Sequence, residues 1–366
     1  MPPKGKGFFI WKIPSCEGGE PKKIAYTAYK AGLTHVLVKI ANGIYDYNYD
    51  TSSRKDLVAP LANELSKYGI KTWGWHYVFG DLPKEEAKAA IRQIRKLPLE
   101  GYVIDAESEY KGKYTPCRIF MNELRSSLPD YPMALSSFRY PKYHMDLPWI
   151  DFLSKCDYNM PQVYWEQAHN PGEQLARSLS EFKTNVSPYK PVIPTGAAYG
   201  GSGWYPTSSE IIEFINKALS LGLSGVNFWS WDYCRLKLPN LWETISSFEW
   251  PSAPNPQKDI IEVLIEAMNS KDLSKIIALY QADAVRIDAI RTIQGHTAIQ
   301  TWYQNFFQGE FKDANFKISE MIVNDPIRKF SWIVNFSTGL SKSGTDTIGL
   351  SGGKILYHYS SFTNSI

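Results

Sequence analysis

Two acidic side chains follow a short apolar run in the segment EGYVIDAESEY, residues 100–110. Residues 102–104 indicate a buried β-strand, and Asp105 and Glu107 stand two positions apart at its carboxyl end. Because side chains alternate between the faces of a strand, both carboxylates would point to the same side. Adjacent like charges raise the pKa of one group, and a raised pKa suits a general acid. We therefore predict a functional carboxylate pair; the alternative is a solvated strand end or an ion pair with Lys39.

The elements that must position this pair repeat along residues 1–250, where short apolar runs alternate with loops and amphipathic stretches. Eight such units in a segment of this length predict an α/β fold, the (β/α)8 TIM barrel. A doubly wound open sheet is the alternative, but it usually carries a Gly-rich phosphate turn, and the sequence has no GxGxxG or Walker motif. The expected strands are residues 7–13, 34–41, 71–79, 101–108, 131–138, 156–165, 190–199 and 224–232.

Three of the amphipathic stretches also carry helix signals at their ends. Residues 54–70 have apolar side chains at helical spacing and reach Gly69, a typical C-terminal cap. Residues 207–222 begin with Thr and Ser, which cap helix N-termini. Residues 83–97 place acidic side chains first and basic side chains last, as the helix dipole favours.

Barrel enzymes build their sites from the carboxyl ends of the strands, so polar and aromatic side chains there are candidate site residues. Two carboxylates, hydrogen-bonding groups and aromatic walls are the parts that a glycosidase needs. His76 could instead be a hydrogen-bonded core residue, and one of Trp229 and Trp231 could serve packing alone. Besides the carboxylate pair, the predicted substrate-binding residues are Lys39, His76, Gln162, Tyr164, Trp229, Trp231 and Asp232.

Several of these strand ends resemble motifs of glycoside hydrolase family 25, the lysozyme-type muramidases. HVLVKIANG (35–43) is similar to the family's FVxIKATEG, GWHYVF (74–79) to its GxYHF segment, and IDAES (104–108) to its D-x-E. NFWSWDY (227–233) resembles the late tryptophan strand of these and chitinase-type barrels, and MPQVYW (160–165) resembles the chitinase M-x-Y.

The resemblance implies a role for each matching residue. Glu107 would protonate the glycosidic oxygen, and Asp105 would orient an acetamido group or stabilise the developing positive charge. Gln162 and Tyr164 would hydrogen-bond the reacting sugar, with Trp229 as its floor.

The sequence also departs from the family pattern. Family 25 carries an aspartate on strand one, where this chain reads GFFIWK and reaches its first carboxylate at Glu17; Asn42 replaces the second-strand glutamate. Asp232 or Glu166 could take the place of the missing catalytic carboxylate. The favoured hypothesis is a glycoside hydrolase acting on an N-acetylated polysaccharide such as peptidoglycan. The alternative is a non-catalytic glycan-binding barrel.

A second domain is expected after the Pro-rich segment PSAPNPQ, residues 251–257, which predicts a linker. Residues 258–366 resemble the SnoaL-like α+β cone fold shared with ketosteroid isomerase and nuclear transport factor. Asp288 falls where the isomerases carry their general base, whereas Leu264 stands near the position of the enolate-stabilising tyrosine and cannot donate a hydrogen bond. We expect this domain to bind a small ligand or to form a homodimer. Besides the hydrolase and glycan-binding hypotheses, a third hypothesis is that the pocket of this domain carries the function and the barrel serves as a scaffold.

Composition excludes several function classes. The net charge of +3 is spread along the chain, so no nucleic-acid partner is expected, and no stretch is long enough to span a membrane. The four cysteines have no CxxC spacing and the histidines form no metal-ligand pair, so neither a metal nor another cofactor is predicted. The N-terminus lacks the apolar core of a signal peptide. Either the protein acts where it is made, or it is extracellular and the sequence has been trimmed.

Overall fold

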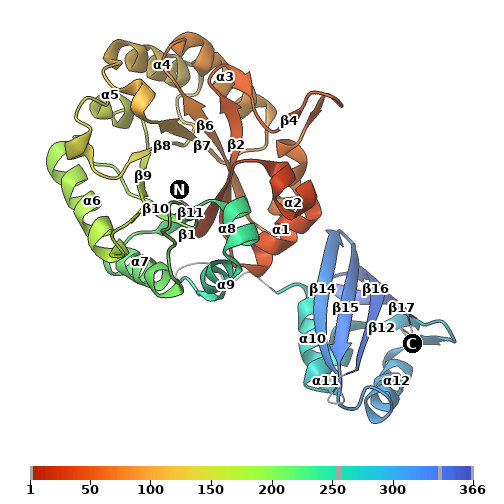
Figure 1. The fold of residues 1–366 in the computed structure, drawn as a ribbon. Helices are drawn as coiled ribbons and strands as arrows, with labels where there is room; N and C mark the ends of the chain where they lie inside the picture. The colour runs from red at the N-terminus through yellow and green to blue at the C-terminus, as the bar shows by residue number, and fades with distance from the viewer. Residues whose placement is uncertain (1–2, 252–257, 337–339, 364–366) are drawn as a thin grey trace. The chain divides into compact units, whose positions relative to one another are not determined.

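The computed structural model describes residues 3–251, 258–336 and 340–363 (Figure 1). The chain divides into two compact units, Met1–Pro256 and Gln257–Ile366. Of the predicted linker, residues 251–257, all but Pro251 lies outside the described residues.

The first unit is a closed barrel of eight parallel strands, which confirms the predicted (β/α)8 fold. The sheet runs in the order β1, β11, β10, β9, β8, β7, β6, β2, and pairing between β1 and β2 closes it. The strands are β1 (Gly5–Ile10), β2 (His35–Asn42), β6 (Lys71–Val78), β7 (Gly101–Ala106), β8 (Met133–Phe138), β9 (Tyr158–Val163), β10 (Thr195–Ala197) and β11 (Gly225–Trp229). The short strands β3 (Tyr45–Asp46), β4 (Tyr49–Asp50) and β5 (Lys55–Asp56) lie in the loop after β2.

Helices surround the barrel and cover the outward faces of the strands (Figure 1). Two of the predicted helix ends are confirmed. At the start of α7, Thr207 and Glu210 form a capping box. In α3, acidic side chains lie in the first turn and basic side chains in the last. The helices are α1 (Pro21–Lys30), α2 (Val58–Lys67), α3 (Pro83–Lys96), α4 (Tyr114–Ser127), α5 (Trp149–Leu153), α6 (Pro171–Asn185), α7 (Ser208–Ser220), α8 (Trp231–Lys237) and α9 (Pro239–Ser247). Short 3-10 turns are η1 (Ile13–Ser15), η2 (Glu17–Gly19), η3 (Ser108–Tyr110) and η4 (Pro141–Tyr143).

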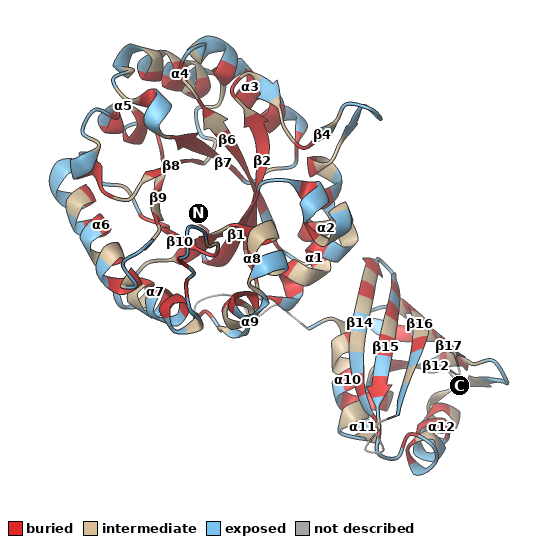
Figure 2. Cartoon of the chain, in the orientation of Figure 1, coloured by how far each residue is buried: buried red, intermediate tan, exposed pale blue. Residues whose placement is uncertain are grey.

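Alternate residues of the barrel strands fill the interior with apolar side chains. Figure 2 shows the strands mostly buried, whereas helices such as α6 alternate between buried and exposed positions. Residues two positions further along the same strands face the same way, so they form the next layer toward the carboxyl ends. The interior cluster comprises Phe9, Leu37, Trp73, Trp75, Val103, Ala134, Met160 and Ile193, with Tyr77, Tyr158 and Trp229 packed against it.

The second unit is an α+β domain with one six-stranded sheet, as predicted. The sheet order is β13, β12, β17, β16, β15, β14, and β12 pairs parallel with β17 while the other neighbours are antiparallel. Along β15 exposed and buried residues alternate, so one face of the sheet packs inward. The elements are α10 (Ile260–Asn269), α11 (Leu273–Ala278), β12 (Tyr280–Ile287), β13 (Thr292–Gln294), α12 (His296–Gln308), β14 (Asn315–Asn324), β15 (Ile327–Asn335), β16 (Ser341–Ser351) and β17 (Lys354–Thr363).

Candidate functional site

The structure brings Asp105 and Glu107 together at the carboxyl end of β7. Asp105 is buried, and Glu107 follows the last strand residue with an extended backbone (φ −125°, ψ −142°) and is half-buried. The Gln162 side-chain amide, from β9, donates to Asp105 Oδ1 at 3.0 Å and to Glu107 Oε1 at 2.9 Å. These two bonds place the two carboxylate oxygens at most 5.9 Å apart.

Burial is the main influence on the acidity of this pair. It raises the pKa of Asp105 well above its usual value, and the neighbouring Glu107 charge raises it further, while Lys39 and the Gln162 hydrogen bond oppose the rise. Burial also raises the pKa of Glu107, and the hydrogen bond from Gln162 partly offsets this. Because the two groups are adjacent and desolvated, the pair holds a proton more readily than two isolated carboxyls would.

Lys39 lies in the same layer of the barrel, inside a group of aromatic rings. Its ammonium donates to Asn42 Oδ1 at 2.8 Å. The Nζ atom is 4.6 Å from the ring centres of both Tyr47 and Trp75. Burial lowers the pKa of Lys39 to about 8, although the Asp105 charge acts in the opposite direction. Lys39 therefore supplies a positive charge to a layer that also holds the carboxylates.

Aromatic side chains line the mouth beside the carboxylates. Trp229 ends β11, and its ring lies 5.4 Å from Trp75 and 6.2 Å from the exposed Trp11. Tyr164 packs edge-to-face against Tyr199 at 5.3 Å. Burial raises the pKa of Tyr164 well above its usual value, so its hydroxyl stays protonated and able to donate. These rings give the mouth flat apolar surfaces beside its polar groups.

Two predicted substrate-binding residues, His76 and Trp231, lie away from this layer. His76 has the opposite strand parity to Trp75 and is fully buried, with its ring nitrogens bonded to Tyr102 Oη and the Gly43 carbonyl. Trp231 begins α8 rather than extending β11, and it packs against Trp242 with ring centres 4.7 Å apart.

Asp232 also belongs to α8. It lies in the first turn of the helix and accepts a hydrogen bond from Ser230 Oγ at 2.7 Å. This residue therefore lies past the end of β11 rather than on the strand that carries Trp229.

Sequence reasoning missed two strand residues of the mouth, Ser136 and Tyr77. Ser136, on β8, lies 3.5 Å from the Gln162 amide nitrogen. Tyr77, on β6, donates to Glu109 Oε2 at 2.7 Å. Strand parity carries the signal for Ser136 and Tyr77, because each stands two positions after an inward-facing interior residue, Ala134 or Trp75.

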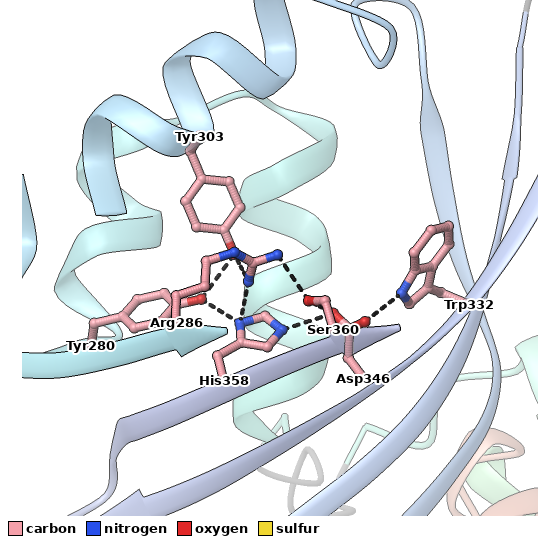
Figure 3. A network of polar contacts seen from close by, with 7 residues as sticks. All are labelled: Tyr280, Arg286, Tyr303, Trp332, Asp346, His358 and Ser360. Carbon is pink, nitrogen blue, oxygen red and sulfur yellow. Dashed lines mark hydrogen bonds and ion pairs between the residues drawn. The ribbon is translucent and has the colours of Figure 1, made fainter. Parts of the chain in front are cut away.

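The second unit contains a buried network of charged and polar side chains, shown in Figure 3. Asp346 on β16 accepts hydrogen bonds from Trp332 Nε1 at 3.1 Å, from Ser360 Oγ at 3.1 Å and from His358 Nε2 at 2.7 Å. Arg286 on β12 reaches the other side of the same group, where it donates to His358 Nδ1 at 2.8 Å and to Ser360 Oγ at 2.9 Å. Arg286 and Asp346 are thus linked through two shared partners.

These contacts fix the protonation of His358. A guanidinium can only donate, so His358 Nδ1 must accept from Arg286, and Nε2 carries the proton given to Asp346. Burial lowers the pKa of His358 to about 4, and the Arg286 charge lowers it further against the opposing effect of Asp346. The Tyr280 hydroxyl is also 2.5 Å from Nδ1 and 2.9 Å from the Tyr303 hydroxyl. Both ring nitrogens are therefore occupied, and the network is structural rather than a free acid–base pair.

Asp288 lies at the edge of a separate cavity of about 340 Å³, whose walls include Trp302, Phe306 and Trp332. Its carboxylate accepts hydrogen bonds from the backbone N–H groups of Ile290 and Arg291, both at 2.9 Å, and from Trp302 Nε1 at 3.1 Å. Burial alone would raise the pKa of Asp288, but these hydrogen bonds outweigh it and hold the pKa below its usual value. A carboxylate so stabilised is a weak base.

Two general features complete the description. Within residues 3–251, 258–336 and 340–363, no cluster of three or more His, Cys, Asp or Glu side chains is arranged to hold a metal ion. In the same ranges, no helix combines the length and apolar character needed to cross a membrane.

Residues 261–358 match the family model of the SnoaL-like domain, which confirms the resemblance for the second unit. No curated protein matches the chain. The resemblance of the barrel to family 25 hydrolases therefore stays a prediction.

Three similar solved structures each match over 29% of this chain. A hypothetical protein with a ketosteroid isomerase-like fold from Catenulispora acidiphila, in complex with trimethylamine, is 14% identical over 87% of its own chain, with a TM-score of 0.27. NTF2-like proteins of unknown function from Cytophaga hutchinsonii and Burkholderia xenovorans are 13% and 14% identical over 88% and 82% of their chains, with TM-scores of 0.24 and 0.26.

Proposed function

We propose that the barrel is a glycoside hydrolase acting on an N-acetylated polysaccharide such as peptidoglycan, with Glu107 as general acid and Asp105 assisting. The observation that carries the proposal is the Gln162 amide, which holds two buried or half-buried carboxyl groups together at the mouth of a closed barrel. Barrel enzymes place their chemistry at this end of the strands, and glycosidases need two carboxyl groups flanking the scissile bond.

The proposed roles follow from the surroundings of each carboxyl. Burial favours the protonated form of Glu107, which is the form that donates a proton to the leaving oxygen. Burial and the Glu107 charge raise the pKa of Asp105, and the Lys39 charge opposes this rise and favours the ionised form. An ionised Asp105 can orient an acetamido N–H or stabilise the positive charge that develops on the sugar. Trp229 offers a flat face beneath the ring.

The spacing of the pair supports a retaining reaction. The Gln162 contacts limit the two bonded carboxyl oxygens to at most 5.9 Å, an upper bound that includes the separation of about 5–5.5 Å found in retaining enzymes. Inverting enzymes need about 6.5–9.5 Å, because a water molecule must fit between base and sugar.

The first test is to incubate the protein with purified peptidoglycan and with chitin oligosaccharides and to analyse the soluble products by mass spectrometry. Glu107→Gln keeps the size of the side chain but cannot donate the proton, so it should release no product above background. Glu100→Gln is the matched control, because Glu100 is exposed and precedes the opposite end of β7. Full activity of Glu107→Gln on a cleaved glycan would rule out the acid role.

A second candidate function is glycan binding without cleavage. It is favoured by β1, which has no carboxylate and is buried along its whole length, and by the aromatic Trp11 that follows it. In this case the protein would bind glycan saturably, Trp229→Ala would abolish binding, and no product would appear.

For the second unit we propose binding of a small molecule in the 340 Å³ cavity beside Asp288. Its aromatic walls suit a flat apolar ligand, and the low basicity of Asp288 argues against isomerase-type proton abstraction. Leu264, fully buried on α10, supplies no hydrogen bond there. Homodimerisation through this unit is the other proposed role, and light scattering of the full chain and of a chain ending at residue 250 would test it.

A further inference from the structure

A cavity of about 420 Å³ adjoins the carboxylate pair at the barrel mouth. Gln162 and Tyr164 form part of its lining, and Gln162 is the residue that donates to both carboxylates. The rest of the lining comes from the end of β8 and the segment after it, from Glu166 after β9, and from α6. A sugar held at the carboxylate pair can therefore extend a substituent into this cavity.

Two arginines give the cavity its chemical character. Arg177 is already paired, since its Nε lies 2.9 Å from Glu181 Oε1 and its guanidinium stacks on the Tyr140 ring at 4.0 Å. Arg139 is half-buried, and its guanidinium carbon lies 5.1 Å from the centre of the same ring. Within the described part of the chain, the Arg139 side chain has no ion pair or hydrogen bond of its own.

The acidic group that lines the cavity is engaged elsewhere. Glu166 accepts a hydrogen bond from the Tyr199 hydroxyl and forms no ion pair with Arg139 within the ranges that the structure describes. Arg139 thus presents a half-desolvated guanidinium, with all of its N–H donors free, to a cavity that opens from the candidate active site. Such a group gains most from an anionic partner with two oxygens, because its planar fork matches a carboxylate.

We propose that this cavity binds a carboxylate carried by a sugar of the substrate, with Arg139 as the residue that recognises it. The inference rests on the proposed function, because a glycan at Asp105 and Glu107 is what brings the substituent to the cavity. The volume lies within the range of about 300–1,000 Å³ that is typical of small-molecule sites. Two kinds of sugar share this chemistry: uronic acids, with the carboxylate on the ring carbon chain, and muramic acid, with the carboxylate on a lactyl ether.

Binding of matched sugars to the full-length protein, measured by titration calorimetry, tests the inference without requiring cleavage. One pair is N-acetylmuramic acid against N-acetylglucosamine, and the other is glucuronic acid against glucose. We expect at least one acidic sugar to bind about ten- to a hundredfold more tightly than its neutral partner, as a hydrogen-bonded charge pair would give. The pair that shows the preference identifies the source of the carboxylate.

The variant Arg139→Gln should abolish this preference while leaving the affinity for the neutral sugar unchanged, and Arg139→Lys should restore part of it. Unchanged neutral-sugar binding also shows that the variant is folded. Arg118→Gln is the matched control, because Arg118 is an exposed α4 arginine paired with Asp151. Equal affinities for acidic and neutral sugars, a preference that survives Arg139→Gln, or no binding of either sugar by the wild type would each overturn the inference.

The outcome is separable from that of the proposed hydrolysis. If Arg139 confers the preference but no glycan is cleaved, the hydrolase proposal fails and the carboxylate site stands. If glycan is cleaved by a Glu107-dependent reaction without any acidic preference, the hydrolase proposal stands and the carboxylate site fails.

Discussion

The Asp346→Asn substitution would remove the negative charge from the buried network of the second unit while preserving the size of the side chain. Asp346 is 6% exposed, and Arg286, which shares two hydrogen-bonding partners with it, is 3% exposed. Without the carboxylate, the guanidinium would stay buried with an uncompensated charge. Removing one of two opposite buried charges leaves the other uncompensated, and in a direct buried ion pair this costs about 3–5 kcal/mol. We therefore expect the second unit to lose this much free energy of unfolding.

Hydrogen exchange measured by mass spectrometry on the full-length chain can report this loss for the second unit by itself. Peptides from β12, β16 and β17 should exchange about a hundred- to several-thousandfold faster, at 1.4 kcal/mol for each tenfold change. Barrel peptides should not change. Glu266→Gln is the control, because it breaks a Lys258–Glu266 pair in which both side chains are more than half exposed, and such pairs contribute less than about 1 kcal/mol.

A double-mutant cycle separates the electrostatic coupling of Arg286 and Asp346 from packing effects. Replacing both charges, in Arg286→Met with Asp346→Leu, removes the uncompensated charge along with its partner. The double variant should therefore lose less free energy of unfolding than the two single substitutions together, by about 2 kcal/mol or more. Additive losses, or an Asp346→Asn cost below about 1 kcal/mol, would refute the conclusion that these residues form one buried electrostatic unit.

The pH dependence of the free energy of unfolding tests independently whether the ionised form of Asp346 stabilises the second unit. Burial alone would raise the pKa of Asp346, but the hydrogen bond from His358 and the charge of Arg286 hold it below its usual value. A carboxylate with a depressed pKa contributes stability above the unfolded pKa of about 3.9 and loses it as pH falls through the folded value. The gap between the wild type and Asp346→Asn should thus persist at neutral pH and shrink in acid.

Two further predictions concern the barrel. Because burial raises the pKa of Glu107, hydrolysis should decline as pH rises through that pKa. The Gln162→Met substitution deletes a hydrogen bond that lowers the pKa of Glu107, so it should move this alkaline limb of the pH–rate profile upward. A downward shift of the limb would contradict the acid role. Lys6→Met should lower the free energy of unfolding by about 1–3 kcal/mol, because the Lys6 ammonium donates to the carbonyls of Ile245, Ser246 and Phe248 at the end of α9. Urea unfolding beside the exposed Lys4→Met control would measure this, and equal stability of the two variants would show that water can replace the ammonium.

The sequence predicts the barrel and much of its mouth because strand parity is a strong local rule. The sequence places Asp105, Gln162 and Trp229 at strand ends, and all three lie in or against the inward-facing layer. The same rule explains why His76 lies away from the mouth. His76 stands one position after the inward-facing Trp75, and a shift of one residue moves a side chain to the opposite face of the strand. Trp231 lies away from the mouth for another reason. β11 ends at Trp229 and α8 begins at Trp231, so the alternation of a strand does not apply to this residue.

Other features depend on contacts between distant segments and have no local signal. The Gln162 bridge joins strands that are not neighbours in the sheet, so its existence depends on the stagger of the barrel. Likewise, Arg286 and Asp346 are separated along the chain and meet only because β12 and β16 both pair with β17. Composition and periodicity predict each strand. They do not predict which polar side chains come together when three strands lie side by side in the sheet.

The protonation of the barrel mouth follows from a single constraint on its charged layer. Burial is the largest influence on the pKa values of Asp105, Glu107 and Lys39, and in each case it disfavours the charged form. Isolated charge is costly in such a place, so the layer should hold as little net charge as its groups allow. One proton on Lys39 and one shared by the two carboxyls give a net charge of zero. Burial and the Glu107 charge favour the proton on Asp105, whereas Lys39 opposes this, so the proposed general acid requires the shared proton to pass from Asp105 to Glu107 in the reaction.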